Sequence, residues 1–587
     1  MAGHGICRVL AVGDATESGK VFEAAQIDDS VKTPLNEQLD RLSSLITNIS
    51  YVLAVLILVG RMAVYFVSGP GANGFEWVNF AAYFLSTVMI AVTVIVVAVP
   101  EGLPMAVTLS LAYSMRRMFR TGNLVRKMHA CETMGATTVI CTDKTGTLTQ
   151  NRMTVAEAAF PSLPEGQLTA SEESQLIAEG IAVNSTATLD LSEATRPSVL
   201  GNPTEGALLL WLHAQSQDYR TLREGSKALL ELPFATERKY MAAVVESGVL
   251  PGRRVLYVKG APEIVRALCT QAVGDESVET LNERLLGYQR QAMRTLGFAY
   301  QILEGDEKVI DAERGVVAER LVYLGTVAIS DPVRSDVPEA VEECISAGID
   351  VKIVTGDTSA TAAEIGRQIG LWGEHHSERA IITGPEFEAL SDEEVYNRVD
   401  ELKIIARARP LDKKRLVETL QKRGHVVAVT GDGTNDAPAL KTAHVGLSMG
   451  DGTSVAKEAS DITITDNSFS SIGRAVMWGR SLYQNIQRFI LFQMTVNVAA
   501  CFIVLAGAFM GTDSPLTVTQ MLWVNLIMDT FAAMALASLP PAERVMHDKP
   551  RDRNAFIIDK VMKRTILVTG GLFFLLLLGF VYVCEHA

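Results

Sequence analysis

Basic residues are in deficit in this chain. Its 587 residues include 53 Lys and Arg against 67 Asp and Glu, which gives a formal net charge of −14. A surface that binds nucleic acid needs an excess of cations to neutralise phosphates, so we expect no nucleic-acid partner. The seven cysteines are scattered and form no Cys-x-x-Cys pair, which argues against a disulfide framework and a clustered zinc site. The soluble parts are therefore expected to face a reducing cytosol.

Hydrophobic residues, by contrast, are abundant. They make up 48% of the chain although 20% of the residues are charged, and this mixture predicts membrane spans that alternate with globular domains. Arginines and lysines follow the second apolar segment and fill the connection 540–563, which places both points in the cytosol. Helices that cross roughly 30 Å of hydrocarbon are predicted in the five apolar segments 44–68, 78–108, 486–510, 516–539 and 565–583.

An apolar, β-branched strand, Thr137–Cys141, ends abruptly in the run Thr-Asp-Lys-Thr-Gly-Thr. Such a strand is typical of a parallel sheet buried on both faces, where ligands bind just past the carboxyl ends of the strands. Asp143 at that point can act as a nucleophile towards a phosphoryl group. Thr145 can offer a backbone carbonyl to Mg²⁺ and a hydroxyl to a phosphate oxygen, while Gly146 permits a tight turn. An isolated Asp-x-Thr-Gly, however, is most often a helix cap.

Strands and helices alternate again after an insertion at about 153–325, in the manner of a doubly wound domain. Two of the strand ends carry further polar clusters, Thr355-Gly356-Asp357 and the run Gly-Asp-Gly-Thr-Asn-Asp at 431–436. One Gly-Asp-Gly is usually a plain turn, but clusters at three strand ends favour a site. The predicted strands are 322–330, 351–354, 404–406 and 426–429.

Carboxylates at these strand ends are expected to converge, because the carboxyl ends of parallel strands share one edge of the sheet. A hard cation such as Mg²⁺ requires oxygen ligands. We therefore assign Mg²⁺ to Asp143, the Thr145 carbonyl and Asp432, with Asn435 and Asp436 in support.

Seven consecutive residues, Asp-Lys-Thr-Gly-Thr-Leu-Thr at 143–149, resemble the phosphorylation motif of the P-type ATPases. The resemblance implies a multidomain membrane protein, with transmembrane α-helices, a haloacid-dehalogenase-like α/β phosphorylation domain and an inserted α+β nucleotide-binding domain. It makes Lys413 the cation that neutralises charge at the transferring phosphoryl group, and Asp331 and Arg334 part of a hinge. The catalytic residues that it implies are Asp143, Thr145, Thr355, Gly356, Asp357, Lys413, Asn435 and Asp436.

The same resemblance divides the chain into domains. The phosphorylation domain is expected in two parts around the nucleotide-binding domain, with membrane helices on either side. The expected ranges are 1–36 for the end of an actuator domain and a linker, 37–120 for two spans, 121–152 and 326–475 for the phosphorylation domain, 153–325 for the nucleotide-binding domain, and 476–587 for three spans.

ATP is expected to bind in the insertion, which contains Asn-Pro-Thr-Glu at 202–205 and Lys-Gly-Ala-Pro-Glu at 259–263, both similar to motifs of the family. Phe234 can stack on adenine, although without its neighbouring motif it would be core at even odds. The nucleotide-binding residues that the resemblance implies are Glu205, Phe234, Lys239, Lys259, Gly260, Arg294 and Arg407.

One absence distinguishes this motif from that of a soluble phosphatase. Haloacid-dehalogenase-like phosphatases carry a second Asp two residues after the nucleophile, as a general acid and base for rapid hydrolysis. Here that position is Thr145. The aspartyl phosphate should therefore persist, as a pump requires, and a phosphatase is the least favoured interpretation.

Pro100 and Glu101 interrupt the second apolar segment. Proline removes a helical donor, and unwound backbone and a carboxylate inside a membrane are tolerated where they line a site. Asn525 and Asp529, at i and i+4 on the fourth segment, can complete an oxygen cage that suits Ca²⁺. The Ca²⁺ ligands predicted in this way are the carbonyls of Val96, Val97 and Val99 and the side chains of Glu101, Asn525 and Asp529.

Val-Pro-Glu-Gly-Leu-Pro at 99–104 and Trp-Val-Asn-Leu-Ile-Met-Asp at 523–529 resemble the calcium pumps among the type II P-type ATPases. Two-ion pumps of that group carry Glu and Thr where this chain has Ala500 and Met528. Both departures point to the plasma-membrane-type branch and to one Ca²⁺ per cycle. We also expect a monomer in the plasma membrane, cytosolic catalytic domains and no calmodulin-binding tail.

Two alternatives stay open at this point. The chain could belong to a P-type pump for another cation. The odd number of spans and the absence of the actuator's Thr-Gly-Glu-Ser loop also fit a chain truncated at both ends, which would be a phosphorylatable remnant unable to transport.

Overall fold

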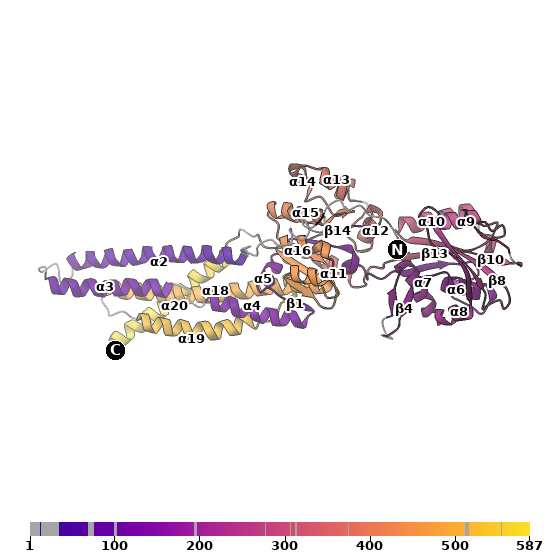
Figure 1. The fold of residues 1–587 in the computed structure, drawn as a ribbon. Coiled ribbons are helices and arrows are strands. Elements are labelled where there is room, and N and C mark those ends of the chain that lie inside the picture. Colours follow the sequence, from indigo (N-terminus) through magenta and orange to yellow (C-terminus); the bar gives the residue numbers. More distant parts are fainter. Residues whose placement is uncertain are drawn as a thin grey trace.

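The computed structural model describes residue 12 and residues 34–67, 76–98, 103–192, 197–275, 277–305, 307–311, 314–373, 375–510, 516–552 and 555–586. Three parts follow one another along an elongated molecule (Figure 1). Long helices lie side by side at one end, an α/β domain occupies the middle, and a domain built on an antiparallel sheet forms the other end.

The long helices contain five stretches, among the described residues, that are long and apolar enough to cross a membrane. These stretches largely coincide with the predicted apolar segments. The second stretch contains α3 up to Ala98 and α4 from Leu103, and the predicted interruption at Pro100 and Glu101 lies outside the described residues. The helices are α2 (Pro34–Val67), α3 (Trp77–Ala98), α4 (Leu103–Arg120), α18 (Ser470–Met510), α19 (Val518–Ala537) and α20 (Lys560–His586), with the short turn η8 (Glu543–Met546) between the last two.

The middle domain is built on an eight-stranded sheet in which all described neighbours are parallel except the edge strand β1. The central strand β2 is buried at every position and serves both faces: Ile140 packs into one core, Val139 and Cys141 into the other. In sheet order the strands are β1 (Asn123–Val125), β19 (Ile462–Ile464), β18 (Val445–Met449), β17 (Val427–Gly431), β2 (Val139–Thr142), β14 (Asp350–Val354), β16 (Ile404–Ala406) and β15 (Ile381–Thr383).

Helices and short turns connect these strands and cover the sheet (Figure 1). They are α5 (Ala130–Gly135), η3 (Lys144–Leu148), α11 (Val337–Ser346), α12 (Ser359–Gln368), η6 (Glu378–Ala380), α13 (Gly384–Ala389), α14 (Asp392–Arg398), α15 (Pro410–Lys422), η7 (Thr434–Asp436), α16 (Ala437–Thr442) and α17 (Ser454–Ala459).

The inserted domain is built on a second, antiparallel sheet that both of its boundary strands enter. The expectation that 322–330 opens the doubly wound sheet is wrong, because β13 pairs with β10 and β3 in this second sheet. The boundary expected at 325 thus falls inside a strand. The strands in order are β3 (Thr154–Ala159), β13 (Val322–Ser330), β10 (Arg294–Leu303), β8 (Arg254–Gly260), β7 (Tyr240–Glu246) and β6 (Lys227–Leu232), with β9 (Gln271–Ala272) beside β13.

Helices cover this second sheet, and the remaining short strands form two small pairs. The helices and turns are η4 (Pro164–Gly166), α6 (Glu172–Val183), α7 (Pro203–Ala214), α8 (Tyr219–Gly225), α9 (Pro262–Leu268), η5 (Val273–Asp275) and α10 (Val278–Arg290). The strand pairs are β4 (Thr188–Asp190) with β5 (Ser198–Leu200), and β11 (Ile310–Asp311) with β12 (Gly315–Val316).

The chain segments that enter and leave the inserted domain are hydrogen-bonded to each other. Asp331 accepts hydrogen bonds from the Thr149 hydroxyl at 2.5 Å and the Arg152 amide at 3.1 Å. Arg334 donates to the carbonyls of Thr149 at 3.0 Å and Gly146 at 3.1 Å. These hydrogen bonds therefore join both connections to the segment that follows β2.

The middle domain joins the membrane helices through α18, which continues out of the apolar region to Ser470. The Arg480 guanidinium on α18 donates to the carbonyls of Val545 at 2.8 Å, Asp548 at 2.6 Å and Ala347 at 2.8 Å. It thereby ties the α19–α20 connection to the end of α11.

Beside this point α5 crosses α18 at two glycines in direct backbone contact. A methyl group at Gly135 would lie 2.2 Å from the carbonyl carbon of Gly479, and one at Gly479 would lie 2.3 Å from the Gly135 nitrogen. No side chain larger than hydrogen fits there. Arg551 adds an ion pair to the buried Glu132 of α5, with its guanidinium 3.7 Å from the centre of the Tyr483 ring.

We expect Gly479→Ala to force α5 away from α18 and to destabilise the protein by about 1–3 kcal/mol, the usual cost of overpacking. Thermal unfolding of the purified chain in detergent should show a melting temperature lowered by several degrees. The matched control is Gly287→Ala in α10, where nothing lies within 4 Å of the added methyl group. Gly287→Ala should melt like the parent or higher, because alanine favours a helix. Equal melting of both variants would contradict the close crossing.

Candidate active site

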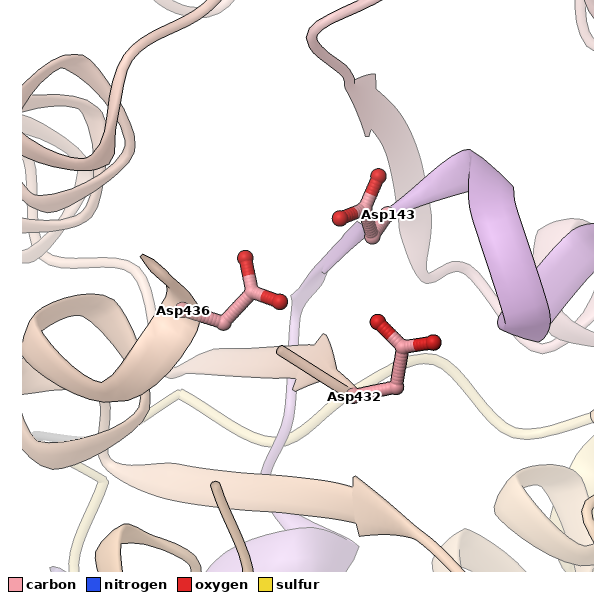
Figure 2. A group of neighbouring side chains, drawn as sticks. All are labelled: Asp143, Asp432 and Asp436. Carbon is pink, nitrogen blue, oxygen red and sulfur yellow. The ribbon is translucent and has the colours of Figure 1, made fainter. Parts of the chain in front are cut away.

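Three carboxylates meet at the carboxyl edge of the parallel sheet, as predicted. Asp143 directly follows β2, and Asp432 and Asp436 come from the loop and turn after β17 (Figure 2). One oxygen from each lies within 4.8 Å of the others. The convergence expected from the strand ends is therefore confirmed.

Lys413, on α15, lies between two of these carboxylates. Its Nζ is 2.7 Å from Oδ2 of Asp143 and 2.6 Å from Oδ1 of Asp436, and its side chain is nearly buried. Burial opposes its charge, but the two neighbouring carboxylates outweigh burial and raise the pKa of Lys413. The lysine therefore stays charged and fixes the orientation of Asp143.

The cluster has more negative than positive charge. Burial raises the pKa of Asp143, and Lys413 only partly offsets this. Burial, with Asp143 and Asp436 nearby, raises the pKa of Asp432 to about 6. Three carboxylates against one ammonium leave a deficit of positive charge that a divalent cation would fill. Because all the available ligands are oxygens, the donor set fits Mg²⁺.

The backbone around the cluster depends on two glycines. Gly146 adopts a left-handed φ of 74°, and a methyl group there would lie 2.3 Å from Oδ2 of Asp432. A methyl group at Gly431 would lie 2.4 Å from Cβ of Asp436. Both positions exclude side chains so that the carboxylates can approach the backbone.

One contributor to this geometry, Thr430, was not found from the sequence. Its hydroxyl donates to Oγ1 of Thr142 at 3.0 Å and accepts from the Asp143 amide at 3.3 Å. It links the ends of β17 and β2, and so holds Asp143 in place. Its only signal in the sequence is its position before the Gly-Asp-Gly run.

The Thr-Gly-Asp cluster reaches the same loop through Lys144. Oδ2 of Asp357 is 2.6 Å from Nζ of Lys144, and the Thr355 hydroxyl accepts from the Asp357 amide at 3.2 Å. Gly356 is exposed, with open space where a side chain would be. The cluster is therefore joined to the carboxylate loop by Lys144, the residue after Asp143.

Three further predicted residues differ in their surroundings. Thr145 is half-buried in the loop after Asp143, whereas the Asn435 side chain is exposed. Arg407 is also exposed and adopts a left-handed φ of 50°, with its amide donating to the Asp357 carbonyl at 2.8 Å. Backbone in this region is strained for a residue with a side chain, and such strain clusters at functional sites.

In the inserted domain, two predicted nucleotide-binding residues form a buried ion pair. Nζ of Lys259 is 2.9 Å from Oε1 of Glu205 and 2.6 Å from the Asn184 carbonyl oxygen. Burial lowers the pKa of Lys259. Burial acts upwards on Glu205, but Lys259 and Thr186 outweigh it and lower the pKa of Glu205. The two groups satisfy each other inside the inserted domain.

Three of the other predicted nucleotide-binding residues, Phe234, Lys239 and Arg294, are exposed. The Phe234 side chain is 60% exposed, which rules out the core alternative. Lys239 is exposed, and Arg294 approaches the Thr204 hydroxyl at 3.4 Å. Gly260 is needed where β8 meets β7, since a methyl group there would lie 2.4 Å from Cβ of Tyr240. An exposed aromatic ring and exposed cations are the residue types that can hold a nucleotide.

The predicted membrane site is described in part. Val96 and Val97 are in the last turn of α3, whereas Val99 and Glu101 lie outside the described residues. The backbone of Asp529 is in α19, but its side chain lies outside the described part. Asn525 is 2% exposed, and neither of its side-chain polar atoms has a hydrogen-bond partner among the described residues.

Comparison with known families agrees with this architecture. Residues 172–336 match the model described as P-type ATPase, cytoplasmic domain N, and residues 513–586 match cation transporting ATPase, C-terminus. Residues 413–476 match haloacid dehalogenase-like hydrolase. Together with the Asp143 motif and the inserted sheet, these matches show that the chain belongs to the P-type ATPases.

Within that family the similarity is to plasma-membrane-type calcium pumps. The chain is 40% identical, over 96% of its length, to calcium-transporting ATPase 5, plasma membrane-type, of Oryza sativa subsp. japonica, of which it covers 55%. The identity is also 40%, over 96% of the chain, to calcium-transporting ATPase 10, plasma membrane-type, of Arabidopsis thaliana, of which it covers 56%. The chain thus spans about half the length of these curated relatives.

We expect Asp432→Asn to weaken binding of a divalent cation at the carboxylate cluster, because it removes a charged oxygen ligand. Mn²⁺, which prefers the same oxygen ligands as Mg²⁺, can be titrated by electron paramagnetic resonance. Its dissociation constant should rise roughly tenfold or more. Asp392→Asn is the control, since the Asp392 side chain is 86% exposed and pairs only with Arg415 among the contacts described. Unchanged Mn²⁺ binding in Asp432→Asn would exclude this carboxylate as a ligand.

Proposed function

We propose that this chain is the catalytic and central membrane part of an ATP-driven Ca²⁺ pump that works through an aspartyl phosphate on Asp143. The observation that carries the proposal is the placement of Asp143, at the end of β2, beside Lys413 and two further carboxylates. The similarity to plasma-membrane-type calcium-transporting ATPases supports the cargo and a plasma-membrane location. The catalytic domains face the cytosol, and the protein acts as a monomer.

In the chemical step a carboxylate oxygen of Asp143 attacks the γ-phosphorus of ATP. The bond from that phosphorus to the β–γ bridging oxygen breaks, and ADP leaves with the electron pair. Lys413 holds the attacking carboxylate and keeps its positive charge beside the developing negative charge. When bound, Mg²⁺, held by Asp143, the Thr145 carbonyl and Asp432, adds charge neutralisation at the phosphate oxygens.

Thr145, two positions after the proposed nucleophile, determines how long the acyl phosphate lasts. Thr145 carries no carboxylate, so it cannot act as a general base towards water. The acyl phosphate therefore persists after ADP has left. A persistent phosphoenzyme is what a pump needs in order to change conformation before hydrolysis.

ATP is delivered by the inserted domain. The exposed Phe234 ring stacks on adenine, while Lys239 and Arg294 meet the phosphates. The buried Glu205–Lys259 pair lies in the same domain. The hinge at Asp331 and Arg334 joins the nucleotide-carrying domain directly to the loop after Asp143.

Ca²⁺ occupies the site between α3, α18 and α19, with ligands from Val96, Val97, Val99, Glu101, Asn525 and Asp529. One ion moves in each cycle, because the position that would hold a second acid is Ala500. This residue is 5% exposed and packs against Val97 and Met521, so apolar side chains fill that space. The contacts of Arg480 and Arg551 connect the phosphorylated domain to the membrane helices.

Asp143→Asn should abolish acid-stable ³²P labelling of the purified chain by γ-labelled ATP, because an amide is not a phosphoryl acceptor. In the parent chain the labelling should require Ca²⁺, since ion occupancy licenses phosphorylation in the proposed cycle. Asp392→Asn should label like the parent. Labelling that persists in Asp143→Asn would show that Asp143 is not the nucleophile. Labelling of the parent chain that does not depend on Ca²⁺ would contradict Ca²⁺ as the transported ion.

A further inference from the structure

Three carboxamide side chains lie buried inside the apolar helix bundle. Gln493 and Asn497 are on successive turns of α18, and Asn525 is on α19. Their exposed fractions are 1%, 3% and 2%. Of these three carboxamides, only Asn525 was among the ion ligands predicted from the sequence. The signal for the other two was present, since Gln493 and Asn497 are at i and i+4 in an apolar span, like Asn525 and Asp529.

The two amides on α18 form a relay that ends on α3. Nε2 of Gln493 donates to Oδ1 of Asn497 at 3.5 Å, and Nδ2 of Asn497 donates to the Ala98 carbonyl at 3.5 Å. Ala98 is the last residue of α3 that the structure describes. Because Gln493 engages the oxygen end of the Asn497 amide, it sets which end of that amide meets α3.

Several polar atoms of this cluster have no partner among the described residues. They are Oε1 of Gln493 and both polar atoms of the Asn525 carboxamide. In hydrocarbon an unsatisfied polar group costs several kcal/mol, so such groups are found where they face a ligand or water. Carboxamide oxygens are ligands for a hard cation.

The helix register places these groups at the depth of the predicted ion site. Ala500 of α18 and Met521 of α19 belong to one buried apolar cluster, and the two helices run in opposite directions. Asn497 lies three residues back from Ala500 and Asn525 four residues forward from Met521, so a rise of roughly 1.5 Å per residue places the two amides at the same depth to within about one residue. One further turn brings Gln493 level with the backbone of Asp529.

We propose that Gln493 is a positioning residue for the intramembrane Ca²⁺ site. It orients the Asn497 carboxamide, and through Asn497 it holds the end of α3 at the distance that the ion requires. The inference rests on the proposed Ca²⁺ transport. Loss of Gln493 frees the Asn497 amide to turn, so the site loses affinity for Ca²⁺ while the distant Asp143 centre keeps its chemistry.

The test is a Ca²⁺ titration of phosphoenzyme formation from ATP, with the full chain in lipid nanodiscs. Gln493→Met keeps the length of the side chain and removes its amide. We expect the half-maximal Ca²⁺ concentration to rise about tenfold, the scale seen when a group that orients a metal ligand is removed. The maximal phosphoenzyme level should not change. Gln493→Asn, which withdraws the amide by one methylene, should shift the titration in the same direction.

A double-mutant cycle separates positioning from a general packing role. If Gln493 acts through Asn497, adding Gln493→Met to Asn497→Ala should produce no further shift. Thr495→Val is the control on the same helix, since the Thr495 hydroxyl donates only to the Leu491 carbonyl, at 2.7 Å, among the described contacts. It should titrate like the parent.

Three results would overturn the inference. They are a parental titration in Gln493→Met or Gln493→Asn, shifts that multiply in the double variant, and a folded variant whose phosphoenzyme is lost at every Ca²⁺ concentration. A parent chain that labels without regard to Ca²⁺ would instead overturn the proposed cargo. The two failures are therefore distinguishable within one experiment.

Discussion

The contact of Lys413 with Asp143 and Asp436 is the interaction on which the rest of the site depends. Three carboxylates at one sheet edge repel one another, and burial makes their charges costly. A single buried ammonium, 2.7 and 2.6 Å from two of them, makes the arrangement tolerable without neutralising it. The remaining negative charge suits a divalent cation, and the fixed orientation leaves Asp143 able to attack. In the proposed phosphoryl transfer, Asp143 is thus oriented by electrostatics rather than by a neighbouring base.

Around that contact, hydrogen bonds and close backbone packing join the neighbouring domains. Asp331 and Arg334 form hydrogen bonds with the loop that follows Asp143, so the inserted domain is attached beside the carboxylate cluster. In the middle domain, α5 crosses α18 with direct backbone contact at Gly135 and Gly479. In the proposed cycle, this contact joins the domain that carries Asp143 to the membrane helices.

Much of this was predictable from the sequence, where residue type and position carry the information. The strand before Asp143 and the three strand-end clusters predicted the carboxylate convergence, because parallel topology places such ends together. Pattern alone could not assign β13, since an apolar strand fits either sheet and only its pairing decides. The need for glycine at positions 135 and 479 could not be predicted, because it arises where two helices far apart in the chain cross. Gln493 and Asn497 carried the i, i+4 signal, but the relay to Ala98 depends on helix packing.

The most direct test of the account is to locate the phosphorylated residue chemically. After incubation with ATP, Mg²⁺ and Ca²⁺ and an acid quench, borohydride reduces an aspartyl phosphate to homoserine, which mass spectrometry detects by position. The account predicts homoserine at position 143, formed only when ATP is present. An unreduced aspartate at 143, with homoserine at 432 or 436 instead, would contradict it.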